Sequence, residues 1–118
     1  MSSDLYGIHF GVWRSPVRTV EAAVELAERI ASSKYVRLDG IMGYEAQIAG
    51  VGDAAPRQAL KNALVRHMKR RSIIELAAKR ARIMERLQEK GIAVRFVNGG
   101  GTGSIASTCV EEAVTEVT

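Results

Sequence analysis

A run of glycines constrains the fold of this chain more than any other feature. Asn98-Gly99-Gly100-Gly101-Thr102-Gly103-Ser104 follows directly on residues 92–97, whose alternating pattern is typical of a β-strand. Three consecutive glycines lose much backbone entropy on folding, so they are costly beside a packed strand. Close approach of another group to the backbone justifies that cost, and a row of backbone N–H groups suits an anion. The run therefore predicts a loop that holds a phosphate group at the end of a strand.

The length and composition indicate one globular domain. The 118 residues suffice for a single core, so we expect one domain over residues 1–118 and no second domain. No apolar run is long enough to cross a bilayer and no secretory leader is visible, which favours a cytoplasmic protein without a membrane partner. The single cysteine, Cys109, fits a reducing compartment, and we expect it to be a packed hydrophobic residue. Because no cluster of histidine, cysteine and carboxylate has metal-site spacing, no metal site is expected.

The basic residues concentrate in one segment. Residues 57–95 hold twelve of the seventeen lysines and arginines, against only three glutamates. A basic helix of this kind could face a nucleic acid. The segment lacks any known reader motif, however, and its basic side chains point around the whole helix. A long solvated helix on the outside of an α/β fold is the interpretation we favour, and we expect no nucleic-acid partner.

Strands and helices alternate along the predicted secondary structure. Strands are expected at residues 5–10, 36–42, 92–97 and 114–118. Helices are expected from about Thr19, a suitable N-cap, to Ser32, and from Pro56 to Glu89. This order favours an α/β fold in which β/α units form a parallel sheet with right-handed crossovers.

An apolar stripe runs along the second helical segment. It comprises Leu60, Leu64, Met68, Ile73, Leu76, Ala77, Arg80, Ile83, Met84 and Leu87. The stripe is interrupted near Arg70-Arg71-Ser72, so either one long helix or two helices meeting at Ser72 would satisfy it. Gly91 is placed where a helix-terminating glycine is expected.

Three segments together resemble one enzyme family. The first is Ile8-His9-Phe10-Gly11-Val12-Trp13-Arg14-Ser15-Pro16-Val17-Arg18, the second is Leu38-Asp39-Gly40-Ile41-Met42-Gly43-Tyr44-Glu45-Ala46, and the third is the glycine run. In this order and spacing they resemble the pyridoxal-phosphate enzymes of fold type III, in the group of D-threonine aldolase, D-serine dehydratase and amino-acid deaminase. The resemblance covers nearly the whole chain.

The resemblance implies a fold and a cofactor site. The chain would form about the second half of an alanine racemase-like (β/α)8 barrel, a partial TIM barrel, whose active site lies at the carboxyl ends of the strands. By family pattern, Arg14 would face the pyridine nitrogen of pyridoxal phosphate and Tyr44 would lie beside the cofactor. The phosphate would be cradled by Gly100, Gly101, Thr102 and Gly103.

Departures from the family pattern limit what this chain can do. His9 stands where the family carries aspartate and Pro16 where it carries glycine. No segment resembles the region of the Schiff-base lysine or the family's metal ligands, so no catalytic residue is assigned within the chain. We expect an inactive piece of a lyase or deaminase that acts on D-amino or D-3-hydroxy amino acids. The alternative is a non-catalytic α/β module that forms a homo-oligomer through exposed sheet edges.

Overall fold

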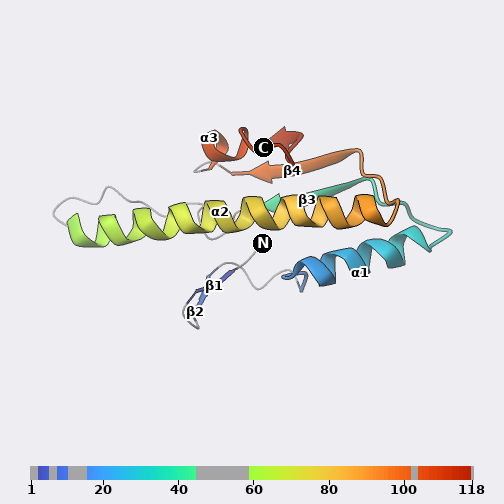
Figure 1. The fold of residues 1–118 in the computed structure, drawn as a ribbon, viewed down its shortest axis with the longest axis horizontal. Helices are drawn as coiled ribbons and strands as arrows, with labels where there is room; N and C mark the ends of the chain where they lie inside the picture. The colour runs from blue at the N-terminus through green and yellow to red at the C-terminus, as the bar shows by residue number, and fades with distance from the viewer. Residues whose placement is uncertain (1–2, 6–7, 11–15, 45–58, 102–103, 118) are drawn as a thin grey trace.

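The computed structural model describes residues 3–5, 8–10, 16–44, 59–101 and 104–117. Its eight elements are β1 (Ser3–Leu5), β2 (Ile8–Phe10), α1 (Val20–Ala31), β3 (Gly40–Tyr44), α2 (Ala59–Glu89), β4 (Phe96–Gly100), α3 (Ile105–Thr108) and β5 (Glu116–Val117). Figure 1 shows α2 running along the long axis of the molecule, with α1 on one side of it and the strands β3 and β4 on the other. Helices and parallel strands therefore form an α/β unit, as the sequence predicts.

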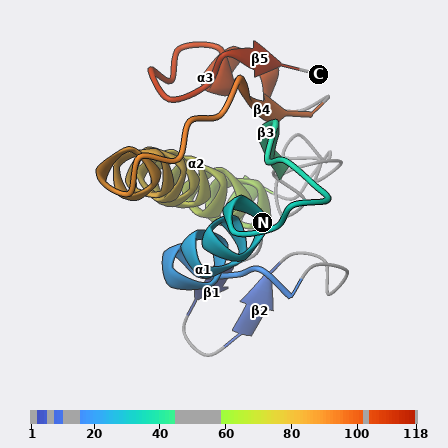
Figure 2. The same ribbon diagram turned by 90° about the vertical axis from the view of Figure 1, so that its right-hand side faces the viewer.

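A three-stranded parallel sheet forms the centre of this unit. Its strands follow the order β3-β4-β5, and each neighbouring pair is parallel. Figure 2 shows the sheet above α2, with α1 below that helix. Parallel neighbours need a crossover connection, and α2 provides the one between β3 and β4. In the described residues the sheet is open, since β3 and β5 each have one neighbour.

The expected first strand is wrong in its pairing and its extent. Residues 5–10 do not form one strand of the parallel sheet; instead β1 and β2 pair antiparallel in a separate two-stranded sheet. Only two residues, which lie outside the described part of the chain, connect these strands. So short a connection permits an antiparallel pair but no parallel crossover.

The first helix follows the sequence prediction closely. The Thr19 hydroxyl accepts a hydrogen bond from the Ala22 N–H at 3.1 Å, which caps the amino end of α1. Val24 and Ala27 on its apolar face are buried against Ile83 and Leu87 of α2. These four side chains form the core between the two helices.

The second helix is continuous, which settles the alternative left open by the sequence. Helix α2 passes through Arg70-Arg71-Ser72 without a break. Among the stripe side chains that the structure describes, Leu76, Arg80, Ile83 and Leu87 are buried, whereas Leu60 is 87% exposed. At its carboxyl end, Gly91 has φ 69°, and the Gly91 and Ile92 N–H groups donate to the carbonyls of Gln88 and Leu87. This is the Schellman arrangement, for which a left-handed glycine is favoured.

The three parallel strands begin later than the sequence predicts. Strand β3 starts at residue 40 instead of 36, β4 at 96 instead of 92, and β5 at 116 instead of 114. Asn98, Gly99 and Gly100 consequently belong to β4 and not to a loop. Because glycine is disfavoured in strands on average, the sequence did not predict that these three residues belong to β4. Packing outweighs the preference here, because a Cβ at Gly40 would lie 2.4 Å from the ring of Phe96, its register partner on β4.

Candidate functional site at the carboxyl edge of the sheet

The carboxyl ends of β3 and β4 bring two predicted site segments together. Tyr44, the last residue of β3, is the register partner of Gly100, the last residue of β4. Gly101 follows immediately on the chain. Of the six residues predicted to bind the cofactor, these three therefore lie at one edge of the sheet. Arg14, Thr102 and Gly103 lie outside the described residues.

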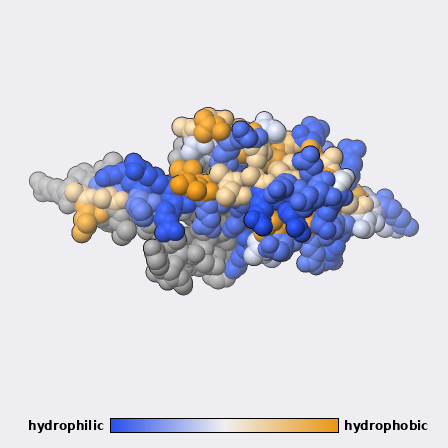
Figure 3. All heavy atoms as spheres, in the orientation of Figure 1, coloured by the Kyte–Doolittle hydropathy of each residue, from blue (hydrophilic) through white to orange (hydrophobic). Residues whose placement is uncertain are grey.

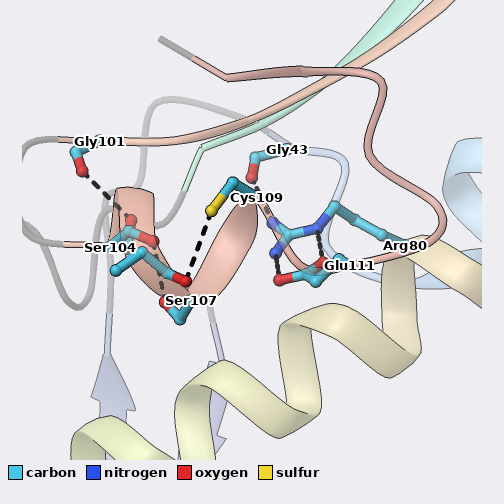
Figure 4. Close-up of polar contacts among 8 residues, drawn as sticks. Gly43, Arg80, Gly101, Ser104, Ser107, Cys109 and Glu111 are labelled. Carbon is cyan, nitrogen blue, oxygen red and sulfur yellow. Dashed lines mark hydrogen bonds and ion pairs between the residues drawn. The ribbon is translucent and has the colours of Figure 1, made fainter.

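The turn after β4 requires glycine at its start. Gly100 has φ 94°, a left-handed conformation that residues with a Cβ rarely adopt. The Gly101 carbonyl then accepts a hydrogen bond from the Ser104 N–H at 2.8 Å, and the Ser104 hydroxyl lies 3.4 Å from the same oxygen. Figure 4 shows these groups at the amino end of α3. Since α3 has four residues, its dipole is small, and anion binding here would depend on the N–H groups of the loop.

Two glycines of this region are in close contact with side chains of the protein itself. A Cβ at Gly99 would lie 2.9 Å from Cγ2 of Thr108, a residue with 1% exposure. A Cβ at Gly43 would lie 3.1 Å from Cδ of Arg80. Other groups thus approach the backbone closely at Gly43 and Gly99, as predicted for the glycine run, but these groups are side chains of the same protein and not a ligand. The prediction of a ligand applies only to the later glycines of the run.

Arg80 is a buried residue of this edge that the site prediction missed. It is 1% exposed, and its side chain extends from α2 beneath the ends of β3 and β4. Its Nη1 donates to the Gly43 carbonyl at 2.7 Å, while Nε and Nη2 donate to the two carboxylate oxygens of Glu111 at 2.8 and 2.5 Å. Bidentate arginine–carboxylate pairs of this kind are directional and strong. The sequence signal that could have indicated this residue is the position of an arginine within an otherwise apolar helical stripe.

A second ion pair joins the same two strands at their other end. Asp39 precedes β3 and Arg95 precedes β4; Nη2 of Arg95 lies 2.6 Å from Oδ2 of Asp39, and the Arg95 N–H donates to the Asp39 carbonyl at 2.7 Å. The hydrogen bond from Arg95 lowers the pKa of Asp39 below its ordinary value, and the charges of Arg95 and Arg37 act in the same direction. Both side chains of the pair are exposed to solvent, unlike those at the carboxyl edge.

Cys109 differs from its prediction. It is exposed at the carboxyl end of α3, with Sγ 3.6 Å from the Ala106 carbonyl, and is not a packed hydrophobic residue. Cys109 follows the last helical residue, Thr108, and it is Thr108 that is buried in the packed layer. Among the residues the structure describes, no three histidine, cysteine or carboxylate side chains gather as metal ligands would. None of the helices within those residues combines the length and apolar character needed to span a membrane.

Comparison with known proteins identifies a distant relative. No family model matches the chain. Over 97 residues, 82% of this chain, the sequence is 30% identical to 3-hydroxy-D-aspartate aldolase of Paracoccus denitrificans (strain Pd 1222). The chain is homologous to part of that aldolase. The match spans 22% of the aldolase, so the chain corresponds to about a fifth of the length of this relative.

Proposed function

We propose that this chain carries the phosphate-binding edge of a pyridoxal-phosphate enzyme that acts on D-3-hydroxy or other D-amino acids. The observation that carries the proposal is the juxtaposition of Tyr44 with Gly100 at the carboxyl ends of two parallel strands. Both belong to segments that resemble cofactor-binding segments of fold type III enzymes. The similarity to 3-hydroxy-D-aspartate aldolase supports the same enzyme class and the D-3-hydroxy substrate.

The sheet topology is consistent with a barrel origin. Strands β3, β4 and β5 are neighbours in chain order and parallel, as consecutive strands of a (β/α)8 barrel are. We propose that this sheet corresponds to part of such a barrel. Barrel enzymes place their active sites at the carboxyl ends of the strands, which is where Tyr44 and Gly101 lie.

The residues at this edge fit a phosphate group. Gly100 and Gly101 present backbone without Cβ atoms, and Gly100 has the left-handed φ that favours glycine. Backbone N–H groups of Gly101 and Gly103 and the Thr102 hydroxyl would donate to phosphate oxygens, in the manner of other glycine-rich anion sites. When bound, pyridoxal phosphate supplies the electron sink for cleavage of a substrate bond.

Two further residues would orient the cofactor ring. Arg14 keeps its proton at any working pH, so it would donate to the pyridine nitrogen without protonating it. The phenol of Tyr44 would order the ring by contact and by hydrogen bonding. Because no segment resembles the Schiff-base lysine region, we expect the chain alone to bind the phosphate weakly and to catalyse nothing.

The test is a titration of the isotope-labelled chain with pyridoxal phosphate, pyridoxal and inorganic phosphate. We expect amide resonances of residues 100–103 to shift with the two phosphate-containing ligands and not with pyridoxal. Gly101→Val should abolish the shifts, because its side chain would obstruct the N–H groups. The matched control is Ala93→Val, at an exposed position near the other end of β4, which should retain them. Absence of phosphate-dependent shifts in the unchanged chain would refute the proposal.

An exposed apolar groove supports self-association as a second candidate function. The groove has a volume of about 230 Å³ and lies between α1 and the open edge of β3, where its lining includes Leu26, Leu38 and Met42. Met42 on this edge strand is 71% exposed. Unpaired strand edges with apolar side chains favour pairing with a second copy. Figure 3 shows a further apolar patch midway along α2, among hydrophilic side chains.

Size-exclusion chromatography over a range of concentrations tests this second candidate. We expect a homo-oligomer that dissociates on dilution, and Met42→Lys should shift the equilibrium towards monomer by placing a charge at the edge. A folded monomer at every concentration would contradict it.

A further inference from the structure

The buried ion pair Arg80–Glu111 joins three separate parts of the chain at one end of the sheet. Arg80 belongs to α2, Gly43 to β3 and Glu111 to the segment between α3 and β5. The two charged side chains are 1% and 9% exposed. Figure 4 shows the guanidinium lying between the Gly43 carbonyl and the Glu111 carboxylate. Such a contact fixes distances between elements that are 31 and 37 residues apart in sequence.

The atoms fixed by this pair adjoin the candidate phosphate site. The carbonyl that Arg80 holds belongs to the residue before Tyr44. The Cζ atom of Arg80 would lie 3.6 Å from a Cβ added at Gly99, the residue before Gly100. Glu111 follows α3, whose amino end begins at the turn after Gly101. Displacement of the guanidinium would therefore release both site segments together.

We propose that Arg80 and Glu111 are positioning residues that set the geometry of the strand ends at residues 43–44 and 99–101, which adjoin the proposed phosphate site. The ligand in this inference, a phosphate group, rests on the proposed function. The positioning role itself rests on the contacts of Arg80 and Glu111. Neither side chain is assigned a contact with the phosphate. The bidentate geometry holds the guanidinium plane in one orientation, and that plane joins the end of β3 to the segment after α3, next to Gly99 of β4.

The structure provides a matched control at the opposite end of the same strands. Asp39–Arg95 joins β3 to β4 through an ion pair of similar chemistry, but before the strands begin. A general loosening of the sheet would follow from disrupting either pair. A specific effect on the phosphate-binding turn would follow only from disrupting Arg80–Glu111.

The experiment compares Glu111→Gln and Arg80→Lys with Asp39→Asn in the full chain. Glu111→Gln removes the carboxylate charge with little change of shape, and Arg80→Lys keeps the positive charge but loses the planar fork. Three quantities are measured: affinity for pyridoxal phosphate relative to pyridoxal, amide hydrogen exchange along β3 and β4, and thermal unfolding. Arg80→Gln is added to show whether loss of the charge alone unfolds the chain.

The expected result is an effect at one end of the sheet. Glu111→Gln and Arg80→Lys should weaken phosphate-dependent binding about tenfold and speed amide exchange at residues 43–44 and 99–101, while the chain stays folded. Asp39→Asn should leave the affinity unchanged and affect exchange only near residues 40 and 96. Equal losses of affinity in Asp39→Asn and Glu111→Gln, or no loss in either, would overturn the inference.

The two proposals fail in different ways. If the unchanged chain shows no preference for pyridoxal phosphate over pyridoxal, the proposed function is refuted. In that case the amide hydrogen exchange measurement by itself tests the positioning role. Faster exchange confined to the carboxyl ends of β3 and β4 in Glu111→Gln supports that role, and uniform or unchanged exchange overturns it.

Discussion

Replacement of Gly99 by alanine tests whether this glycine is retained for packing within the protein. The added Cβ would lie 2.9 Å from Cγ2 of Thr108, 3.5 Å from Cγ2 of Val114 and 3.6 Å from Cζ of Arg80. Thr108 is 1% exposed, so its methyl group has no solvent to move into. Overpacking of this kind costs about 1–3 kcal/mol. We expect Gly99→Ala to lower the free energy of unfolding by that amount.

The assay is urea-induced unfolding at neutral pH, with Thr108→Ser as the second member of a double-mutant cycle. Serine keeps the hydroxyl of Thr108 and deletes the methyl group that the new Cβ would meet. The double variant should therefore recover part of the loss, with a coupling of about 1 kcal/mol in its favour. If Gly99→Ala alone changes stability by less than about 0.5 kcal/mol, or the two changes are additive, the packing argument is refuted.

Two smaller effects follow from the same structure. Gly91→Ala places a Cβ at φ 69° with no neighbour within 4 Å, so backbone strain alone should lower the free energy of unfolding by about 1 kcal/mol. The measurement is the urea midpoint, and an unchanged midpoint would contradict the Schellman assignment. Because Arg95 lowers the pKa of Asp39, this pair contributes stability above the ordinary pKa of 3.8 that is lost as the pH falls below it. Asp39→Asn should flatten that part of the acid stability profile, and an unchanged profile would contradict the assignment.

The helices were largely predictable because their signals are local. The Thr19 cap and the spacing of Val24 and Ala27 lie within a few turns of one another, and the structure confirms both. The single helix α2 continues through Ser72, a point the sequence left open. The exposure of Leu60 was not predictable, since it depends on which parts of α2 have a neighbour.

The strands and the site were only partly predictable because they depend on distant residues. Gly40 and Gly99 lie in strands, where Phe96 and Thr108 respectively pack against them. The sequence prediction placed Gly40 within a strand but Gly99 in a loop, because glycine is disfavoured in strands on average. The pairing of Tyr44 with Gly100 follows from the parallel register, which no sequence window contains. The resemblance to fold type III enzymes nevertheless selected both residues.

The buried ion pair illustrates what sequence reasoning could not reach. Arg80 was visible as a charged residue within an apolar stripe, but its partner Glu111 is 31 residues away and lies beyond two further elements. Nothing in the spacing of the two residues predicts a contact. Only the packing of α2 beneath the strand ends brings them together.

The measurement that most directly tests the account compares the calorimetric affinities of the chain for pyridoxal phosphate and for pyridoxal. The two ligands differ only in the phosphate group, so the difference isolates the turn that follows β4. We expect measurable binding of pyridoxal phosphate, at least about tenfold weaker binding of pyridoxal, and loss of the difference in Gly101→Val. Equal affinities for the two ligands, or a preference that persists in Gly101→Val, would contradict this expectation.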